Sequence, residues 1–178
     1  MNIIDCFKIF KLVLNNSKES AVGAWLVKNA KTLSIAESCT GGLLSSLMTD
    51  VSGSSAYIKA NFVTYANEAK EQYLNVKPET LTQYGAVSVQ TAEEMVRGLL
   101  KNTGSDYALA TTGIAGPTGG TKEKPVGLVY IGVGKADSVK VIKYNVNHKY
   151  PRLLIKYMFA KKAVACLNEF LYEKKEVE

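Results

Sequence analysis

Ala36-Glu37-Ser38-Cys39-Thr40-Gly41-Gly42 is the stretch of this sequence that decides the fold, because it directly follows the apolar-alternating run Thr32-Leu33-Ser34-Ile35. The pattern predicts a strand over residues 32–36 that ends in a hydroxyl and a thiol, then turns through two glycines into a helix from Thr40 to about Val51. The first N–H groups of such a helix point back at the end of the strand, so a nucleophile and an anion site would be neighbours. This arrangement predicts acyl or phosphate chemistry on an anionic small molecule. The same residues are also typical of a plain helix start, in which Ser38 or Thr40 serves as the N-cap and the glycines allow tight strand–helix packing.

The composition predicts one folded domain in a reducing compartment. The chain has 178 residues, 47% of them hydrophobic, which suffices for one substantial core. Its three cysteines, Cys6, Cys39 and Cys166, are widely spaced and indicate neither a disulfide framework nor a zinc cluster. We therefore predict a single domain over residues 16–175. Residues 1–15 form an apolar N-terminal extension, and the sequence leaves open whether it is a helix, a strand or a contact arm.

The net charge of +6 comes from Lys and Arg residues that are spread along the chain rather than gathered with aromatics into one stripe. The densest group, between Lys149 and Lys175, falls on a predicted C-terminal helix and is explained by a solvated helix face, so no nucleic-acid partner is predicted. The excess charge suits a phosphorylated substrate.

The N-terminal segment carries Asp5 and Lys8 within its apolar part, unlike a signal peptide. No apolar stretch of the sequence is long enough to cross a bilayer. We therefore expect a soluble cytoplasmic protein without a membrane partner.

Helical and extended patterns alternate along the chain, which predicts the α/β class. Strands are predicted over residues 32–36, 57–65, 106–110, 126–133 and 139–145, and helices over residues 17–27, 40–51 and 88–100, with a short one from Asn67 and a last one from Pro151. The last two strands are most simply joined as a hairpin through residues 134–138. Strands separated by helices imply a sheet covered on both faces, with one antiparallel pair near the end.

Three polar clusters follow predicted strands of this sheet. They are residues 37–42, Thr64-Tyr65-Ala66-Asn67-Glu68-Ala69-Lys70, and the glycine-rich segment 111–120. In an α/β sheet, ligands collect at the carboxyl ends of the strands, where helix N-termini face the crevice. The three clusters are therefore expected to converge on one site.

Within that crevice Ser38 needs a base, since an unassisted hydroxyl is a poor nucleophile near neutral pH. The single histidine, His148, lies far along the chain, which argues against a Ser-His-Asp arrangement. Lys70 lies in the first turn of a short helix, where the helix dipole and partial burial lower its pKa, so a neutral amine there can accept the Ser38 proton. Tyr65 can relay or orient that proton. The alternatives are a surface lysine and a strand-end aromatic with a wet hydroxyl.

Cys39 is a rival nucleophile, because the pKa of a thiol falls at a helix N-terminus, although the residue is also explained as a small buried filler. Ser54 and Ser55 are typical turn residues whose hydroxyls can also bind a phosphate. The segment 113–120 is not a phosphate-cradling Gly-x-x-x-x-Gly-Lys-Ser/Thr loop, since no lysine followed by a hydroxyl closes it. Its backbone N–H groups can still approach a ligand.

Six segments between about Thr32 and Gly134 together resemble the CinA C-terminal domain family, whose characterised members are nicotinamide mononucleotide amidohydrolases. In chain order these segments are Ala36-Glu37-Ser38-Cys39-Thr40-Gly41-Gly42, Gly53-Ser54-Ser55-Ala56, Phe62-Val63-Thr64-Tyr65-Ala66-Asn67-Glu68-Ala69-Lys70, Tyr84-Gly85-Ala86-Val87-Ser88, Gly113-Ile114-Ala115-Gly116-Pro117 and Lys124-Pro125-Val126-Gly127.

The resemblance implies a three-layer α/β/α fold with a mixed, mostly parallel sheet. It also implies hydrolysis of the carboxamide of nicotinamide mononucleotide to nicotinic acid mononucleotide and ammonia by a serine–lysine dyad, without metal or cofactor. By position, Ser38 is the nucleophile, Lys70 the general base and later the acid, and Tyr65 the proton relay, with amides around residues 39–42 stabilising the oxyanion. A homo-oligomer is expected by the same analogy. The substrate-binding residues are then Cys39, Thr40, Gly41, Gly42, Ser54, Ser55, Thr112, Gly113 and Gly116.

Two departures from the family pattern bear on function. Members often carry a Gly-Asp-Arg-like element before the last helix where this chain has Val146-Asn147-His148, which puts the phosphate or ribose contact expected there in question. Nothing in the sequence corresponds to the upstream molybdopterin-binding-like domain of two-domain members, so the standalone deamidase is the better analogy. Two other functions stay open: a non-catalytic, competence-associated nucleotide-binding module, and a cysteine amidase that uses Cys39.

Overall fold

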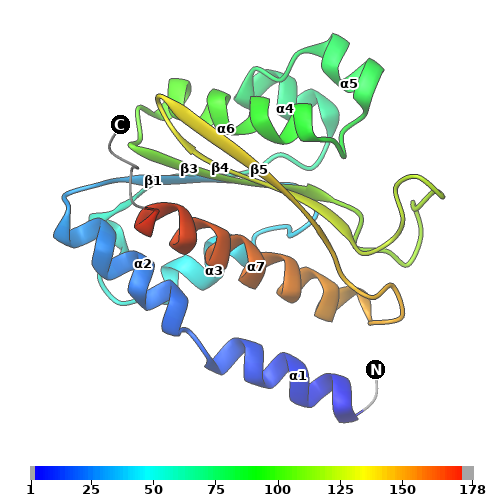
Figure 1. The fold of residues 1–178 in the computed structure, drawn as a ribbon, viewed down its shortest axis with the longest axis horizontal. Coiled ribbons are helices and arrows are strands. Elements are labelled where there is room, and N and C mark those ends of the chain that lie inside the picture. The colour runs from blue at the N-terminus through cyan, green and yellow to red at the C-terminus, as the bar shows by residue number, and fades with distance from the viewer. Residues whose placement is uncertain (1–2, 174–178) are drawn as a thin grey trace.

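The computed structural model describes residues 3–173, so the predicted domain end at residue 175, and with it Lys174 and Lys175, lies outside the described residues. Seven α-helices, one short 3-10 helix and five strands make up this part of the chain (Figure 1). In chain order they are α1 (Ile3–Leu14), α2 (Ser17–Lys28), β1 (Leu33–Glu37), α3 (Leu43–Thr49), η1 (Ser54–Ala56), β2 (Ile58–Val63), α4 (Asn67–Leu74), α5 (Pro78–Tyr84), α6 (Val89–Thr103), β3 (Tyr107–Gly113), β4 (Leu128–Lys135), β5 (Ser138–Asn145) and α7 (Arg152–Tyr172).

The strands form one mixed sheet in the order β2-β1-β3-β4-β5. Strand β1 pairs in parallel with both β2 and β3, whereas β4 is antiparallel to β3 and to β5. Only β4 therefore runs against the other strands, which confirms the mixed, mostly parallel sheet. The predicted hairpin is β4–β5, which closes between Lys135 and Ser138.

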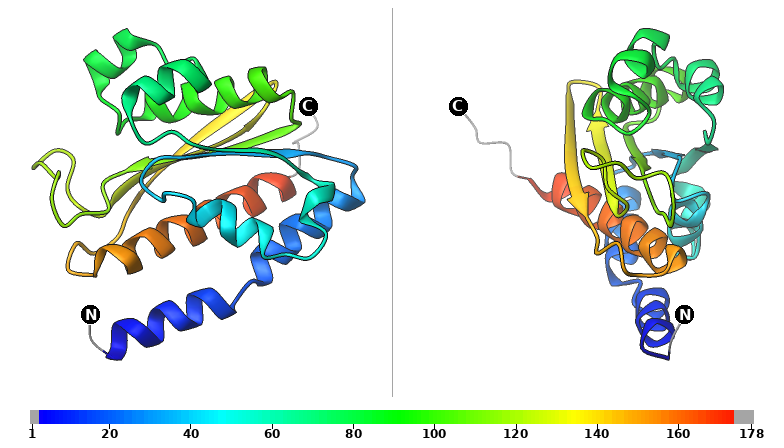
Figure 2. Two further views of the ribbon diagram at one scale, coloured as in Figure 1. Left: turned by 180° about the vertical axis from the view of Figure 1, so that it is seen from behind. Right: turned by 90° about the vertical axis from the view of Figure 1, so that its right-hand side faces the viewer.

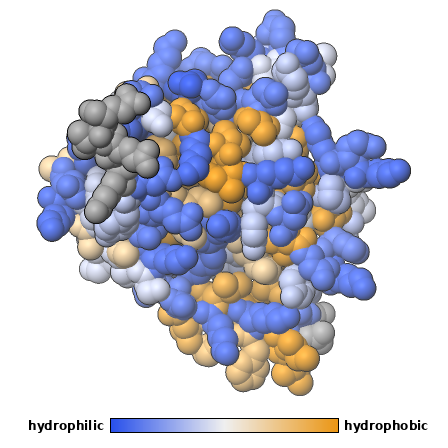
Figure 3. All heavy atoms as spheres, viewed as in Figure 1, coloured by the Kyte–Doolittle hydropathy of each residue, from blue (hydrophilic) through white to orange (hydrophobic). Residues whose placement is uncertain are grey.

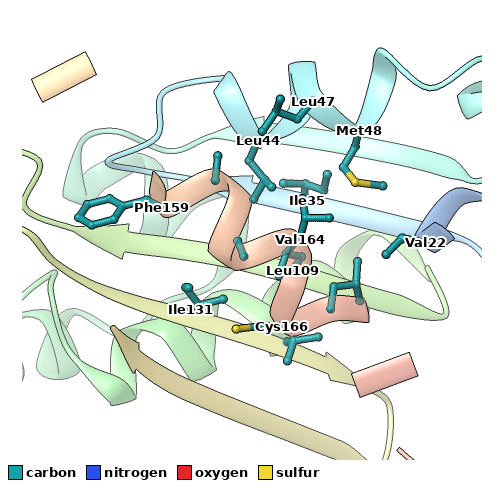
Figure 4. Packing of buried hydrophobic residues seen from close by; sticks show 14 of the residues in the cluster. Val22, Ile35, Leu44, Leu47, Met48, Leu109, Ile131, Phe159, Val164 and Cys166 are labelled. Carbon is teal, nitrogen blue, oxygen red and sulfur yellow. The ribbon is translucent and has the colours of Figure 1, made fainter. Parts of the chain in front are cut away.

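Helices cover both faces of the sheet, which confirms the α/β class with three layers (Figures 1 and 2). Helices α2, α3 and α7 lie on one face, and α4, α5 and α6 lie on the other. In the larger core, Phe159 and Val164 of α7 pack against Ile35 of β1 and Leu109 of β3 (Figure 4). Both central strands are almost wholly buried, so the short apolar runs in the sequence mark the middle of the sheet.

Three details of the fold differ from the sequence prediction or extend it. Helix α3 begins at Leu43 rather than Thr40, because Gly41 and Gly42 have φ angles of 59° and 94° and the chain cannot be helical there. Helix α5 was not predicted. The N-terminal extension, whose structure the sequence left open, is the helix α1. No helix within residues 3–173 combines the length and apolar character needed to span a bilayer.

Helix α4, which carries Lys70, lies unusually close to α6. A Cβ atom at Gly98 of α6 would lie 1.7 Å from the carbonyl oxygen of Leu74, so only glycine permits this approach. The main-chain contact fixes the C-terminal end of α4 against α6. It thereby sets the position of Lys70 one turn earlier in the same helix.

Candidate active site

The carboxyl ends of β1, β2 and β3 lie side by side, since Glu37 at the end of β1 is in register with Val63 of β2 and Thr111 of β3. The segments that follow these strands border one cavity of about 260 Å³, as the three polar clusters predicted. The cavity is lined by Ser38, Cys39, Tyr65, Lys70, Ala86, Val87, Thr112, Gly113, Ile114, Ala115, Gly116, Thr118, Gly119 and Arg152.

Ser38 and Lys70 meet in this cavity although 32 positions separate them in the sequence. Ser38 is the first residue after β1, and its N–H donates to the carbonyl of Thr111 on β3 (3.0 Å), which holds the backbone in line with the sheet. Lys70 lies in the first turn of α4 and points back toward the helix N-terminus, the direction that helical side chains favour. Its Nζ lies 3.3 Å from the Oγ of Ser38. The two groups are therefore within reach of direct proton transfer.

The amine of Lys70 is fully buried, with 0% of the residue exposed. Burial lowers the pKa of Lys70 below its ordinary value of 10.5, and the nearby Cys39 and Glu68 oppose this shift. Removing a charged amine from water is unfavourable, so the buried site favours the neutral form.

The surroundings of the Lys70 amine suit a neutral group as well as a charged one. Its N–H bonds go to the carbonyl oxygens of Thr64 (2.9 Å) and Tyr65 (3.2 Å), with that of Ala66 at 3.5 Å. A neutral amine has two N–H donors and one lone pair. With the two donors directed to the closer carbonyls, the lone pair is left for the hydroxyl of Ser38. In the neutral state the hydroxyl of Ser38 therefore donates to the nitrogen of Lys70, whereas a charged Lys70 donates to Ser38.

Tyr65 borders the cavity but does not touch the Ser38–Lys70 pair through its hydroxyl. The residue is 63% exposed, and its hydroxyl accepts a hydrogen bond from Nη2 of Arg152 (3.2 Å). Arg152 also donates from Nη1 to the carbonyl of Gly116 (2.5 Å). This arginine therefore joins the segment after β2 to the segment after β3. The sequence reasoning missed Arg152, and its only local signal was a position directly after Pro151 at the start of the last helix.

A second cavity of about 700 Å³ adjoins the first and shares Ala115 and Arg152 with it. His148 and Lys149, which stand at the departure from the family pattern, line this second cavity. Val146, by contrast, is buried, and its N–H donates to the carbonyl of Gly127 (2.8 Å). The segment that departs from the family pattern therefore places His148 and Lys149 beside the cavity that holds Ser38 and Lys70.

Cys39 lines the cavity but has a poor environment for a nucleophile. The residue is 5% exposed, and burial raises the pKa of its thiol to about 12. Because the thiolate is the reactive form, the thiol at this position is inert near neutral pH. Of the two adjacent candidate nucleophiles, the hydroxyl of Ser38 has a base, Lys70, beside it, whereas the thiol of Cys39 is not ionised to the reactive thiolate.

Because the thiol of Cys39 is not the nucleophile, we expect Cys39→Ala to keep most of the activity that the site supports. The rate should change by no more than about threefold, which corresponds to a barrier change below about 1 kcal/mol. Product formation is measured with the Cys6→Ser protein, which lacks the exposed thiol and keeps buried Cys39 and Cys166, and with the same protein carrying Cys39→Ala. N-ethylmaleimide should not inhibit the Cys6→Ser protein. Complete loss of turnover in Cys39→Ala, together with inhibition by the reagent, would instead establish a cysteine amidase.

The N-terminus of α3 is occupied by a side chain of the protein itself. The carboxylate of Glu37, which is fully buried, accepts from the N–H groups of Gly42 (3.0 Å), Leu44 (3.0 Å) and Ser45 (2.9 Å), and from the hydroxyl of Ser45 (2.6 Å). A carboxylate is favourable at this position, because the helix dipole and free N–H groups attract an anion. The expectation of an anion site on this helix start is therefore wrong. Gly42 is not available as an oxyanion donor, whereas Glu37 does not use the amides of residues 39–41.

The remaining predicted residues divide between the cavity wall and the supporting structure. The hydroxyl of Thr40 is buried against that of Thr111 (2.8 Å), and Thr40 is not among the residues that line the cavity. Thr112 lines the cavity, and its hydroxyl donates to the carbonyl of Ala86 (2.6 Å). Gly113 and Gly116 also line it. At Gly116, whose φ is 72°, a Cβ atom would lie 2.4 Å from Val126, so glycine is required for this wall.

Ser54 and Ser55 do not join the site of the same chain, which corrects the prediction that they bind substrate there. They form η1 just before β2, whereas Ser38 follows β1. Because β1 and β2 are parallel, the start of β2 and the end of β1 lie at opposite ends of the sheet (Figures 1 and 2). The hydroxyl of Ser54 donates to the carbonyl of Thr49 at the end of α3 (3.4 Å), as in an ordinary turn.

The model of the CinA C-terminal domain matches residues 15–171. The chain belongs to the CinA C-terminal domain family. Helix α1 precedes the matched residues, so it is an addition to the part that the CinA family model describes.

Curated CinA relatives are similar over most of this chain but are much longer. A CinA-like protein of Endomicrobium trichonymphae is 53% identical over 131 residues, which cover 74% of this chain and 31% of the relative. A putative competence-damage inducible protein of Thermoanaerobacter sp. is 54% identical over 125 residues, which cover 70% of this chain and 30% of the relative. The chain thus spans about a third of the length of these relatives.

Solved CinA structures share the fold closely. The competence damage-inducible protein A of Klebsiella pneumoniae has a TM-score of 0.85 at 29% identity, covering 90% of this chain and 98% of that one. The competence/damage inducible protein CihA of Agrobacterium tumefaciens has a TM-score of 0.78 at 38% identity, covering 84% and 93%.

Proposed function

We propose that this protein is a cytoplasmic amidohydrolase that converts nicotinamide mononucleotide to nicotinic acid mononucleotide and ammonia. The observation that carries the proposal is the buried amine of Lys70, 3.3 Å from the hydroxyl of Ser38 in a cavity at the carboxyl ends of the strands. A serine paired with a base is the arrangement that acyl-transfer chemistry needs. The substrate follows from the resemblance of the six sequence segments to the deamidases of the CinA family.

The reaction proceeds in two halves. Lys70 accepts the proton of Ser38 as its oxygen attacks the carboxamide carbon, and the amides of residues 39–41 are the candidate donors to the oxyanion. When the tetrahedral intermediate collapses, the C–N bond breaks, the leaving nitrogen takes the proton from Lys70, and ammonia departs. The nicotinoyl group is then esterified to Ser38. Lys70 next deprotonates a water that attacks the ester, and it returns the proton to the oxygen of Ser38 as the acid leaves. Tyr65 is proposed to orient or relay protons at the mouth of the cavity.

The charge of the surroundings suits a phosphorylated substrate. Arg152 lies between the reaction cavity and the adjoining larger one, which His148 and Lys149 also line. With the carboxamide at Ser38, the phosphate end of the nucleotide is proposed to lie against these basic side chains, since arginine and lysine are favoured phosphate partners.

The direct test is incubation of the purified protein with nicotinamide mononucleotide, with ammonia and nicotinic acid mononucleotide measured together. Equal amounts of both products support the proposal. Tight binding, measured by calorimetry, with no ammonia would identify the alternative, a non-catalytic nucleotide-binding module. Hydrolysis of other amides, with none of this nucleotide, would keep the dyad but overturn the substrate.

The rate should increase with pH as Lys70 loses its proton. Because burial lowers its pKa, the neutral and active form should dominate from a pH below 10.5, the ordinary value. We therefore expect log(kcat/KM) to rise with a slope of about one and to level off before that pH. The Cys39→Ala variant should show the same limb, which would separate the amine from the thiol. A profile that is flat from neutral pH to pH 10 would contradict a titrating base.

A further inference from the structure

We propose that Lys8 of α1 is a positioning residue for the phosphate end of the substrate, because it holds the side chain of Tyr150 in the wall of the larger cavity. This role rests on the proposed function and adds a helix to the site. Helix α1 precedes residues 15–171, which the CinA family model matches, so the contact lies outside the part that the family model describes. The N-terminal addition then contributes to nucleotide binding.

Two contacts join Lys8 to Tyr150, although 142 positions separate them in the sequence. The Nζ of Lys8 donates to the hydroxyl of Tyr150 (3.3 Å) and lies 4.5 Å from the centre of its ring. A cation over an aromatic face is attracted to it, so the ring is restrained as well as the hydroxyl. A phenol oxygen that accepts from an ammonium group still has its own O–H to donate, and the charge strengthens that donor. Tyr150 is therefore prepared to donate to an anion.

Tyr150 stands where the phosphate of the nucleotide is proposed to lie. Its side chain is half-buried, packs against the larger core and lines the cavity of about 700 Å³. His148, Lys149 and Arg152 line the same cavity. The main chain at Tyr150 is fixed, since its N–H donates to the carbonyl of Asn147 (3.1 Å) and α7 begins two residues later. A contact that restrains the side chain therefore completes the wall at this point.

Helix α1 is attached to the domain at more than one place, so Lys8 approaches Tyr150 from a fixed direction. The helix lies beside α7 (Figures 1 and 2). Beyond its C-terminal end, Lys161 of α7 donates to the carbonyl of Asn15 (2.6 Å) and pairs with the buried Glu19 (2.8 Å). These contacts keep the amine of Lys8 over the ring without help from the substrate.

A second lysine of α1 provides a matched comparison for Lys8. The exposed surface of α1 is largely apolar, as the side chains at the lower edge of Figure 3 show, and Lys8 and Lys11 are the basic residues of this helix. Lys11 lines a different cavity, with Glu19 and Lys161. The two lysines thus share a helix and a charge, but Lys8 is the one in contact with Tyr150. An effect of charge alone would appear in both.

The test compares the steady-state kinetics of the natural protein and its variants with nicotinamide mononucleotide. Lys8→Met removes the charge and the donor, so KM should rise about five- to tenfold while kcat stays within about twofold. Tyr150→Phe should raise KM to a similar extent, and the double variant should show little further rise, because the two residues act as one unit. Lys11→Met should keep both constants. Lys8→Arg, which retains the charge and the contact with the ring, should recover most of the loss.

The phosphate group gives a second readout. Nicotinamide riboside is the same molecule without its phosphate, so its kcat/KM should be equal in Lys8→Met and in the natural protein. An equal loss for both substrates would mean that Lys8 only stabilises the fold, and it would overturn the proposal. An unchanged KM for the nucleotide in Lys8→Met would overturn it too. Both results leave the hydrolase in place, since the natural protein still turns over the nucleotide.

Absence of turnover by the natural protein would instead overturn the hydrolase, and calorimetric titration with nicotinamide mononucleotide would then decide the role of Lys8. An affinity of Lys8→Met that is five- to tenfold weaker than that of the natural protein, with Lys11→Met unchanged, supports the role. Equal affinities, or no binding by the natural protein, would overturn it.

Discussion

Ser38→Ala should abolish the release of ammonia from nicotinamide mononucleotide, with a loss of roughly 10⁴-fold or more in kcat, as expected when a catalytic nucleophile is removed. The hydroxyl is the group that the buried amine of Lys70 approaches at 3.3 Å, and no alternative nucleophile is ready to replace it. The neighbouring thiol of Cys39 has a pKa of about 12 and stays protonated. The measurement is a stopped assay of ammonia with a long incubation, so that residual turnover is detected.

The loss must be separated from unfolding and from loss of binding. Ser46→Ala is the matched control, since it removes a hydroxyl from the exposed side of α3 and should leave turnover unchanged. Ser38→Ala should keep the circular dichroism spectrum and bind the nucleotide with an affinity close to that of the natural protein. Residual activity above about a tenth of the natural rate would be incompatible with a nucleophile at this position, because truncation of one normally costs several orders of magnitude.

The sequence predicts the parts of this fold that local patterns determine. Short apolar runs locate all five strands, and the hairpin follows from the close spacing of the last two. The same runs place Ser38 and Lys70 after neighbouring strands. They do not bring the two side chains together, since that depends on β2 lying beside β1 in parallel and on the close approach of α4 to α6 at Gly98. The resemblance to the CinA family, rather than the spacing, singled out the pair.

The errors have physical causes that a single sequence hides. Glycines at positions 41 and 42 look compatible with a helix start, but their left-handed conformation delays it to Leu43. The N-terminus of α3 is not open to an anion, because the carboxylate of Glu37 accepts hydrogen bonds from its N–H groups. In the sequence, nothing distinguishes Glu37 from the other polar residues of the motif. The contact between Arg152 and Tyr65 joins residues 87 positions apart. No local pattern reports a contact of that range.

Two features of the cavity act on the Lys70 amine: backbone carbonyls hold it in position, and burial favours the loss of its proton. Two backbone carbonyls, those of Thr64 and Tyr65, hold the Lys70 amine in place whether or not it is charged. Complete burial then favours the neutral form, so orientation and pKa are set by different features. A base at this position stays aimed at Ser38 throughout a proton-transfer cycle.

Lys70→Met should remove most of the activity, as Ser38→Ala does, and should also change how stability depends on pH. Methionine is close to lysine in length but offers neither a base nor a donor. We expect a loss of at least about 10³-fold in kcat, in the range attributed to a positioned general base. Lys70→Arg should fail as well, because a guanidinium stays protonated and cannot accept the proton of Ser38. Lys101→Met, at an exposed position of α6, is the control for the loss of one lysine.

The stability of Lys70→Met gives the sharper result, because its sign depends on the protonation of the buried amine. A lysine whose pKa is lower in the folded protein than in the unfolded chain releases its proton on folding at any pH between the two pKa values. The natural protein therefore gains stability as pH rises from the folded pKa toward 10.5, and it loses that gain as pH falls back to the folded pKa, below which both states carry the proton. The methionine variant has no proton to release on folding, but it leaves the carbonyls of Thr64 and Tyr65 without the Lys70 donor, at about 1–3 kcal/mol for the buried carbonyl of Thr64. Urea unfolding between pH 7 and pH 10 should therefore show the natural protein ahead at high pH, with the difference narrowing as pH falls. A difference that is constant over this range would mean that Lys70 keeps the same charge in the folded and unfolded protein, and the base assigned to Ser38 would have to be sought elsewhere.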